Sequence, residues 1–283
     1  MENSTDPAVL RALAEQLATE AAEFVLRRRN EVFGTGAGPS APTGGDARTV
    51  RAKSSPTDPV TIVDTETERW LRERLAELRP GEHVLGEEEG GQFDGRAGLS
   101  WVIDPIDGTV NFVYGIPAYA VSVAVQRDGR SVAGAVANVA AGTVYSAALG
   151  QGAQVRHGDV TTPLRCSAAD DLGMALLGTG FSYDPAQRRQ QAELLTHLLP
   201  AVRDVRRIGS CALDLCMVAA GQLDAYYEDN VQVWDWAAAA LIAAEAGATV
   251  WLPAPSGVAV LAAAAPGVAD ALHDALAGAG VDL

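Results

Sequence analysis

The 283-residue chain is poor in cysteine, histidine and basic side chains, and each shortage excludes a class of function. The four histidines are scattered singly, so a structural zinc site is not expected and any metal should have oxygen ligands. Basic residues number 21 against 36 acidic ones, and a net charge of −15 argues against generic nucleic-acid binding. The cysteines form no CxxC pair, which favours a reducing compartment over a disulfide framework; they are Cys166, Cys211 and Cys216.

Long apolar runs and a secretion signal are also missing. Residues 1–7 are polar and acidic, and no apolar run reaches the roughly 18 residues that a membrane span requires. The chain is still 48% hydrophobic, which is enough to form a core. We therefore expect a soluble, cytoplasmic protein with no membrane partner and no direct nucleic-acid partner.

Hydrophobic periodicity predicts helices alternating with short strands. The expected helices are 8–30, 62–79, 185–200, 210–220, 234–246 and 266–277. The expected strands are 99–103, 118–126, 132–149, 174–179, 223–227 and 258–264, with Gly129 at the turn between the second and third. We expect a flexible loop at 34–46 and, from the glycines near 150–165, a boundary between subdomains 1–155 and 156–283.

The most informative segment is WVIDPIDGTVNF at 101–112. A buried strand there runs into two carboxylates three residues apart, followed by a glycine and a helix start. Carboxylates at a strand end can converge on a hard cation, and free amides at a helix N-terminus suit a phosphate. The alternative is a turn followed by helix capping from Asp107 or Thr109, and this segment alone does not decide between them.

Two further acidic segments have the same two interpretations. GEEEGG at 86–91 is either a solvated acidic loop or the source of another metal ligand. Asp235, within WDW at 234–236, either caps an alanine-rich helix or is a cation ligand that this helix holds rigidly.

Two more segments could act beside these carboxylates. KSSPTDPVTIVD begins with Lys53, the only lysine, and ends with Asp64, which could cap a helix or pair with the Thr109 hydroxyl and orient a water. The amides of 209–212 could bind an anion or sugar hydroxyls, and Glu228 could accept a substrate hydroxyl. Ordinary capping and a surface carboxylate are the alternatives here.

Other hydrolytic machinery is absent from the sequence. There is no GxSxG nucleophile elbow, no GK[ST] phosphate loop, and no cysteine followed six positions later by arginine. The DxxDGT spacing also differs from the DxD pair of aspartyl-phosphate phosphatases. Several oxygen-rich segments in a chain without another catalytic set favour the metal interpretation.

Taken in order, these segments resemble the inositol monophosphatase family. The resemblance rests on KSSPTDPVTIVD, GEE, WVIDPIDGTVNF, GSCALDLC, WD and EAG, and covers about residues 50–250. It implies an α/β fold, a five-layer αβαβα sandwich of the sugar-phosphatase type. It also implies lithium-inhibited hydrolysis of inositol monophosphate to myo-inositol and phosphate, two or three Mg²⁺ ions per site, and a homodimer.

The resemblance assigns roles residue by residue. The implied metal ligands are oxygen donors, namely Glu87, Asp104, the carbonyl of Ile106, Asp107 and Asp235. The residues implied in orienting the attacking water are Glu87, Thr109 and Asp64. The implied substrate contacts are Asp107, Gly108, Thr109, Gly209, Ser210, Cys211, Glu228 and Asp235.

Alternatives remain for the substrate and for the cellular role. Gln232, Ser210 and Cys211 stand where the family often has His, Thr and Ala, which affects recognition of the alcohol rather than hydrolysis. A fructose-1,6-bisphosphatase or a histidinol-phosphate phosphatase would use the same metal core. The non-enzymatic alternative is a regulatory protein that binds the transcription or ribosome-assembly machinery, a role that some bacterial relatives resemble.

Overall fold

The computed structural model describes residues 4–34, 50–53, 59–91, 98–253, 260–281 and 283. Its α-helices are α1 (Pro7–Phe33), α2 (Ile62–Leu78), α3 (Thr109–Tyr114), α4 (Pro185–Leu198), α5 (Cys211–Ala219), α6 (Val233–Glu245) and α7 (Pro266–Gly278). Two 3₁₀ turns, η1 and η2, cover Leu172–Met174 and Leu199–Ala201. No helix among the described residues is long and apolar enough to span a membrane, and the three cysteines are free.

The larger sheet has seven strands, which follow one another in chain order. They are β3 (His83–Gly86), β4 (Leu99–Asp107), β5 (Ala120–Arg127), β6 (Arg130–Asn138), β7 (Thr143–Ala148), β8 (Ala153–His157) and β9 (Val160–Pro163). The pair β3–β4 is parallel and all later pairs are antiparallel. Short turns therefore build most of this sheet.

The smaller sheet has five strands in the order β11-β10-β12-β14-β13. Their bounds are β10 (Leu176–Thr179), β11 (Asp204–Arg206), β12 (Ala225–Asp229), β13 (Thr249–Trp251) and β14 (Val260–Ala264). Strand β10 pairs in parallel with β11 and β12, and β14 pairs antiparallel with β12 and β13. A separate hairpin, β1 (Val50–Ala52) with β2 (Pro59–Thr61), precedes α2.

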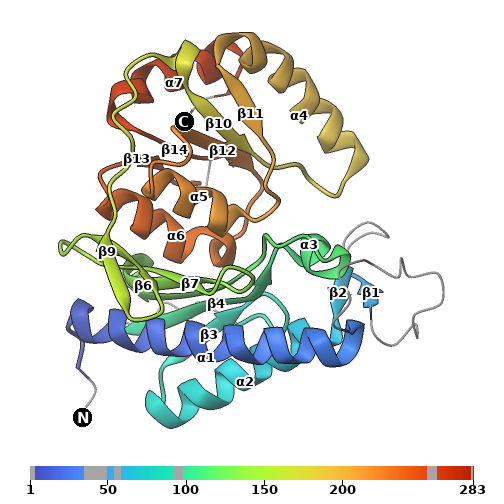
Figure 1. Ribbon diagram of the computed structural model, residues 1–283, viewed down its shortest axis with the longest axis vertical. Helices are drawn as coiled ribbons and strands as arrows, with labels where there is room; N and C mark the ends of the chain where they lie inside the picture. Colours follow the sequence, from blue (N-terminus) through green and yellow to red (C-terminus); the bar gives the residue numbers. More distant parts are fainter. Residues whose placement is uncertain (1–3, 35–49, 54–58, 92–97, 254–259, 282) are drawn as a thin grey trace.

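The layers stack from one end of the molecule to the other (Figure 1). Helices α1 and α2 cover one face of the seven-stranded sheet, where Trp101 and Ile103 are buried. Val102 points to the opposite face and packs with α5 and α6, which also contact the five-stranded sheet. Helices α4 and α7 cover the far face of that sheet. The predicted five-layer αβαβα sandwich is confirmed.

Small side chains allow α6 to lie very close to the seven-stranded sheet. A Cβ atom added at Gly134 of β6 would lie 2.9 Å from the Cα and Cβ atoms of Ala238. The alanines of α6 from Ala237 to Ala243 are buried for the same reason. This close packing fixes the start of α6, where Asp235 lies, against the sheet that carries the other acidic residues.

The predicted helices and most of the predicted strands agree with the structure to within a few residues, but the predictions for 132–149 and 150–165 are wrong. The expected strand 132–149 is two strands, β6 and β7, because the chain turns at Gly142, whose φ is 64°. The segment 150–165, expected to be loose, contains β8 and β9. The turn at Gly129 is confirmed. Within the expected loop and the last strand, residues 35–46 and 258–259 lie outside the described part of the chain.

Candidate active site

A β-bulge at the end of β4 brings two predicted carboxylates to one side of the sheet. Asp104 pairs with Ser122 and Asp107 with Ala120, so β4 contains one residue more than β5 across this interval. In a regular strand, residues three apart point to opposite faces, and the extra residue removes that alternation. The Ile106 amide donates a hydrogen bond to Asp104 Oδ1 (2.9 Å), which stabilises the bulge.

The two carboxylates line a cleft of about 440 Å³ between the two sheets. Every predicted site residue except Asp64 contributes to its wall: Glu87, Asp104, Ile106, Asp107, Gly108, Thr109, Gly209, Ser210, Cys211, Glu228 and Asp235. Segments far apart in the sequence thus meet in one place. The sequence grouped these residues from their motifs, and the structure brings them together.

Asp64 lies directly behind this wall. Thr109 Oγ1 is 3.0 Å from Asp64 Oδ1 and 3.0 Å from the carbonyl oxygen of Ile106. The other oxygen of Asp64 accepts hydrogen bonds from the amide (3.0 Å) and hydroxyl (2.5 Å) of Thr61, the N-cap of α2. Asp64 therefore both belongs to the capping box of α2 and pairs with the Thr109 hydroxyl, while its role in orienting a water stays a prediction.

Asp107 connects the end of β4 to the start of α5. Its Oδ2 atom accepts hydrogen bonds from the hydroxyl of Ser210 (2.5 Å) and the amide of Ala212 (2.7 Å), at the start of α5. The alternative that Asp107 caps the helix that follows it is wrong, because Gly108 is the N-cap of α3 and has no side chain to cap with. Burial raises the pKa of Asp107 to about 6, although both hydrogen bonds oppose this shift.

Asp235 combines capping with a place in the cleft. Its Oδ2 atom accepts a hydrogen bond from the amide of Gln232, the N-cap of α6 (2.6 Å). Burial raises the pKa of Asp235 well above its usual range, and the negative charge of Asp107 raises it further. Burial likewise raises the pKa of Asp104, with Glu87 as the next contribution.

Lys53 neutralises part of the negative charge in the cleft. Its ammonium lies 2.8 Å from Glu87 Oε1 and also donates to Glu88. Burial lowers the pKa of Lys53, but the charges of Glu87 and Glu88 outweigh burial and raise it overall. Lys53 therefore lines the cleft and pairs with its acidic residues.

The donor set in the cleft suits a hard divalent cation. It consists of carboxylates and one carbonyl, and buried carboxylates that repel one another are stabilised when cations separate them. Within the part of the chain that the structure describes, no three such side chains form a preformed cage. The Glu87 carboxylate, one of the predicted ligands, forms an ion pair with the Lys53 ammonium.

Glu228 lines the cleft from β12, a strand of the five-stranded sheet. Its Oε2 atom accepts a hydrogen bond from the Tyr226 hydroxyl (2.5 Å), and burial raises its pKa to about 7. A Cβ atom at Gly180 would lie 2.0 Å from the Glu228 carboxylate, so only glycine leaves room for it. Nearby, Asn111 Nδ2 donates to the carbonyls of Ala118 (2.7 Å) and Ile208 (2.9 Å), which holds the backbone before Gly209.

Sequence reasoning missed part of the cleft wall. Gly180, Phe181 and Tyr183 line it from the loop after β10, and Arg207 lines it just before Gly209. The glycine in GTGFSYD was a usable clue to a close backbone approach, whereas nothing local indicates that Phe181 or Tyr183 faces the site.

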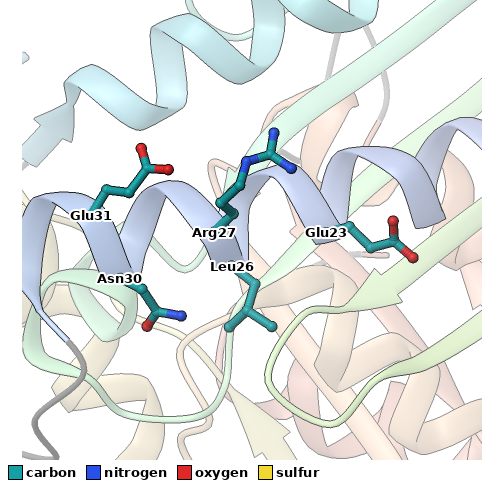
Figure 2. Close-up of a pocket in the computed structure, with 5 residues that line it drawn as sticks. All are labelled: Glu23, Leu26, Arg27, Asn30 and Glu31. Atoms are coloured by element: carbon teal, nitrogen blue, oxygen red, sulfur yellow. The ribbon is translucent and has the colours of Figure 1, made fainter.

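A second hollow of about 480 Å³ lies on the surface of α1 (Figure 2). Its lining side chains all come from that one helix: Glu23, Leu26, Arg27, Asn30 and Glu31. They do not converge from separate elements as the cleft residues do. The cleft between the sheets is therefore the candidate active site.

Comparison with known proteins agrees with this geometry. A family model described as the inositol monophosphatase family matches residues 6–280. The chain belongs to this family. As a member it is a phosphatase, as the sequence motifs predicted.

Individual family members are also similar over nearly the whole chain. The inositol-1-monophosphatase of Mycobacterium leprae (strain TN) is 66% identical over 279 residues, covering 96% of this chain and 94% of that protein. The solved structure of Mycobacterium tuberculosis SuhB superposes with a TM-score of 0.83 at 57% identity, covering 98% of this chain and 99% of that chain. A protein named Nus factor SuhB from Pasteurella multocida (strain Pm70) is 38% identical over 198 residues, covering 69% of this chain and 72% of that protein.

Proposed function

We propose that the protein hydrolyses inositol monophosphate to myo-inositol and phosphate, with magnesium as cofactor and water as the nucleophile. The observation that carries this proposal is the convergence of Glu87, Asp104, Asp107 and Asp235 on one cleft between two sheets. Two or three Mg²⁺ ions held there by these carboxylates and the Ile106 carbonyl would neutralise the phosphate and lower the pKa of a bound water.

The side chains behind the cleft would orient the attacking water. Two hydrogen bonds from Thr61 fix the Asp64 carboxylate, which in turn can accept a hydrogen bond from the Thr109 hydroxyl. In that arrangement the lone pairs of Thr109 Oγ1 remain available to accept a hydrogen bond from water. Glu87, which lines the same cleft as Thr109, would complete the orientation of this water.

Other groups would bind the two ends of the substrate. The backbone at Gly108 has a left-handed conformation (φ 96°) at the start of α3, and its amide and that of Thr109 would donate to the phosphate. The Glu228 carboxylate would accept a hydroxyl of the inositol ring, with Gly209, Ser210 and Cys211 beside it. Hydrogen bonds to ring hydroxyls would then select the alcohol.

Phosphate release from a substrate panel tests the proposal. Inositol 1-phosphate, fructose 1,6-bisphosphate and histidinol phosphate are each incubated with Mg²⁺, with EDTA, and with Mg²⁺ plus lithium. We expect the highest kcat/KM for the inositol ester, no turnover in EDTA, and inhibition by lithium. Equal turnover with and without EDTA would overturn the metal mechanism, and a preference for either other ester would replace the substrate.

A regulatory role beside catalysis is a second candidate, supported by the similarity to a protein named Nus factor SuhB. An Asp104→Asn gene tests it in cells that lack the wild-type gene. Growth and ribosomal RNA synthesis at wild-type levels would show a role independent of phosphatase activity. Loss of both with the catalytic activity would leave hydrolysis as the whole function.

We further propose that the protein acts in the cytoplasm as a homodimer, without a direct nucleic-acid or membrane partner. The acidic composition, with 36 acidic against 21 basic residues, supports the absence of these partners. Sedimentation equilibrium of the purified protein in Mg²⁺ tests the dimer, and a monomeric mass at micromolar concentration would overturn it.

A further inference from the structure

We propose that Glu68 and Arg72, both on α2, are positioning residues that fix the loop carrying Glu87 and thereby set the affinity of the cleft for divalent cations. This inference rests on the proposed metal-dependent function, but it concerns residues that the metal does not contact. The loop in question is 87–91, which follows β3 and returns to it through a bridge between Gly86 and Gly90.

Glu68 holds the backbone of this loop from behind. Its side chain is fully buried, and its two carboxylate oxygens accept the amides of Glu88 (2.7 Å, to Oε2) and Glu89 (2.9 Å, to Oε1). These are the two residues that directly follow Glu87. A carboxylate that accepts consecutive amides fixes the direction of the peptide chain, and therefore the direction in which Glu87 leaves it.

Arg72 completes this contact from the next turn of α2. Its Nε and Nη2 atoms lie 2.9 and 2.8 Å from Glu68 Oε1, so the guanidinium compensates the buried charge. The same guanidinium donates to the carbonyl of Val84 on β3 (3.2 Å) and to that of Gly90 at the end of the loop (2.5 Å). One side-chain pair therefore contacts the strand before the loop, its middle and its end.

Gly86, which precedes the acidic residues, leaves room for the Glu68 carboxylate. A Cβ atom at Gly86 would lie 2.4 Å from Glu68 Oε1 and 2.7 Å from Oε2. Gly86 has no positive φ, so the requirement is for space and not for an unusual backbone conformation. The glycine in GEEE lets the Glu68 carboxylate reach the amides of Glu88 and Glu89.

A purely stabilising role does not account well for this arrangement. Ion pairs of this kind contribute little net stability, because desolvation offsets their attraction, whereas the hydrogen bonds of this pair reach β3 and the loop that carries Glu87. The loop carries Glu87 and Glu88, which both face Lys53 at the cleft. Residues that orient a metal ligand by hydrogen bonding change metal affinity by about 10- to 100-fold when they are replaced.

Mn²⁺ binding to the full chain tests the inference, with free Mn²⁺ measured by electron paramagnetic resonance. The variants are Glu68→Gln, which places an NH₂ group against a backbone amide, and Gly86→Ala, which keeps every charge and displaces the carboxylate. The control is Glu77→Gln, which breaks an exposed ion pair with Arg74 on the same helix. We expect Mn²⁺ dissociation constants about 10- to 100-fold higher for the two variants and unchanged for the control.

Amide hydrogen exchange in EDTA provides a readout that does not involve metal. We expect the amides of Glu88 and Glu89 to exchange faster in Glu68→Gln than in the wild-type protein, while amides in β5 and β6 keep their protection. Urea unfolding identifies variants that fail to fold. If Glu68→Gln does not fold, Gly86→Ala supports the same comparison.

The outcomes separate this inference from the proposed function. Wild-type affinity for Mn²⁺ in a folded Glu68→Gln or Gly86→Ala protein would overturn the positioning role and leave the phosphatase proposal intact. Equal weakening in the Glu77→Gln control would also overturn it, since the effect would then be a general one of charge on α2. Absence of Mn²⁺ binding by the wild-type protein would overturn the proposed function and this inference with it.

Discussion

Glu228 reaches the cleft only because two neighbouring residues allow it. Gly180 leaves room for the carboxylate, and the Tyr226 hydroxyl donates to it at 2.5 Å. Without that hydrogen bond the carboxylate can rotate away from a substrate hydroxyl. If Glu228 accepts a substrate hydroxyl as proposed, recognition of the alcohol depends on Tyr226, a residue that does not itself line the cleft.

Tyr226→Phe tests this dependence. We expect KM for inositol 1-phosphate to rise about tenfold, the effect of one hydrogen bond to a charged group, with kcat nearly unchanged. Steady-state kinetics with phenyl phosphate are the control, because that ester has no hydroxyl for Glu228 to accept. An equal rise in KM for both esters would show that Tyr226 acts on the cleft as a whole.

Asp104→Asn tests the acidic residues at the same scale. The substitution keeps the shape of the side chain and removes its charge, so we expect kcat/KM with saturating Mg²⁺ to fall by at least about 100-fold. Phosphate release and urea unfolding are measured together, with Asp274→Asn on the exposed face of α7 as the control. Near-normal turnover by the folded Asp104→Asn protein would contradict the assignment of the cleft.

At the scale of the elements, the packing of α6 against β6 is limited by the absence of a side chain at Gly134. Gly134→Ala would place a methyl group 2.9 Å from Ala238, and we expect it to lower the free energy of unfolding by about 1–3 kcal/mol. Urea unfolding measures this. Gly278→Ala, at the end of α7 with no atom within 4 Å of the added methyl, should leave stability unchanged or slightly higher.

The helices were predictable because their apolar faces recur over many residues and their ends carry caps. The strands were less so. Strand β9 is exposed along its whole length and lacks an alternating apolar pattern, and β3 and β11 are only four and three residues long. The turn at Gly142 was hidden because small apolar residues continue on both sides of it.

The site residues also differ in how far a local sequence pattern predicts them. The acidic residues were predictable because each lies in a short, unusual segment such as WVIDPIDGT. Glu68, Arg72 and Tyr226 were not, because on α2 and β12 they resemble ordinary helix and strand residues. Only the folded chain places Glu68 against the amides of the acidic loop.

At the scale of the whole molecule, buried carboxylates make the metal-free protein sensitive to pH. Burial raises the pKa of Asp64 to about 6 and those of Glu88 and Glu228 to about 7. Groups whose pKa is raised by folding bind more protons in the folded state than in the unfolded state. Their contribution to stability is therefore present at low pH and is lost as pH rises through the folded pKa.

We expect the free energy of unfolding in EDTA to fall between about pH 4.5 and pH 7, and Mg²⁺ to restore it at pH 7. Urea unfolding at half-unit pH steps measures this. Glu228→Gln removes one of the raised groups while keeping an acceptor for Tyr226, so its profile should be flatter. A metal-free profile that rises over this interval would show that the carboxylates are not desolvated as described.

Helices α5 and α6, which lie between the two sheets, have a consequence for synthesis on the ribosome. Strand β9 completes the seven-stranded sheet at Pro163, but α6, which covers its inner face, ends only at Glu245. At roughly 5–20 residues per second, translation leaves that apolar face without its own cover for several seconds, whereas α1 and α2 emerge before the sheet and can cover its outer face at once. The inner face of the sheet is therefore exposed to aggregation until α5 and α6 have been made.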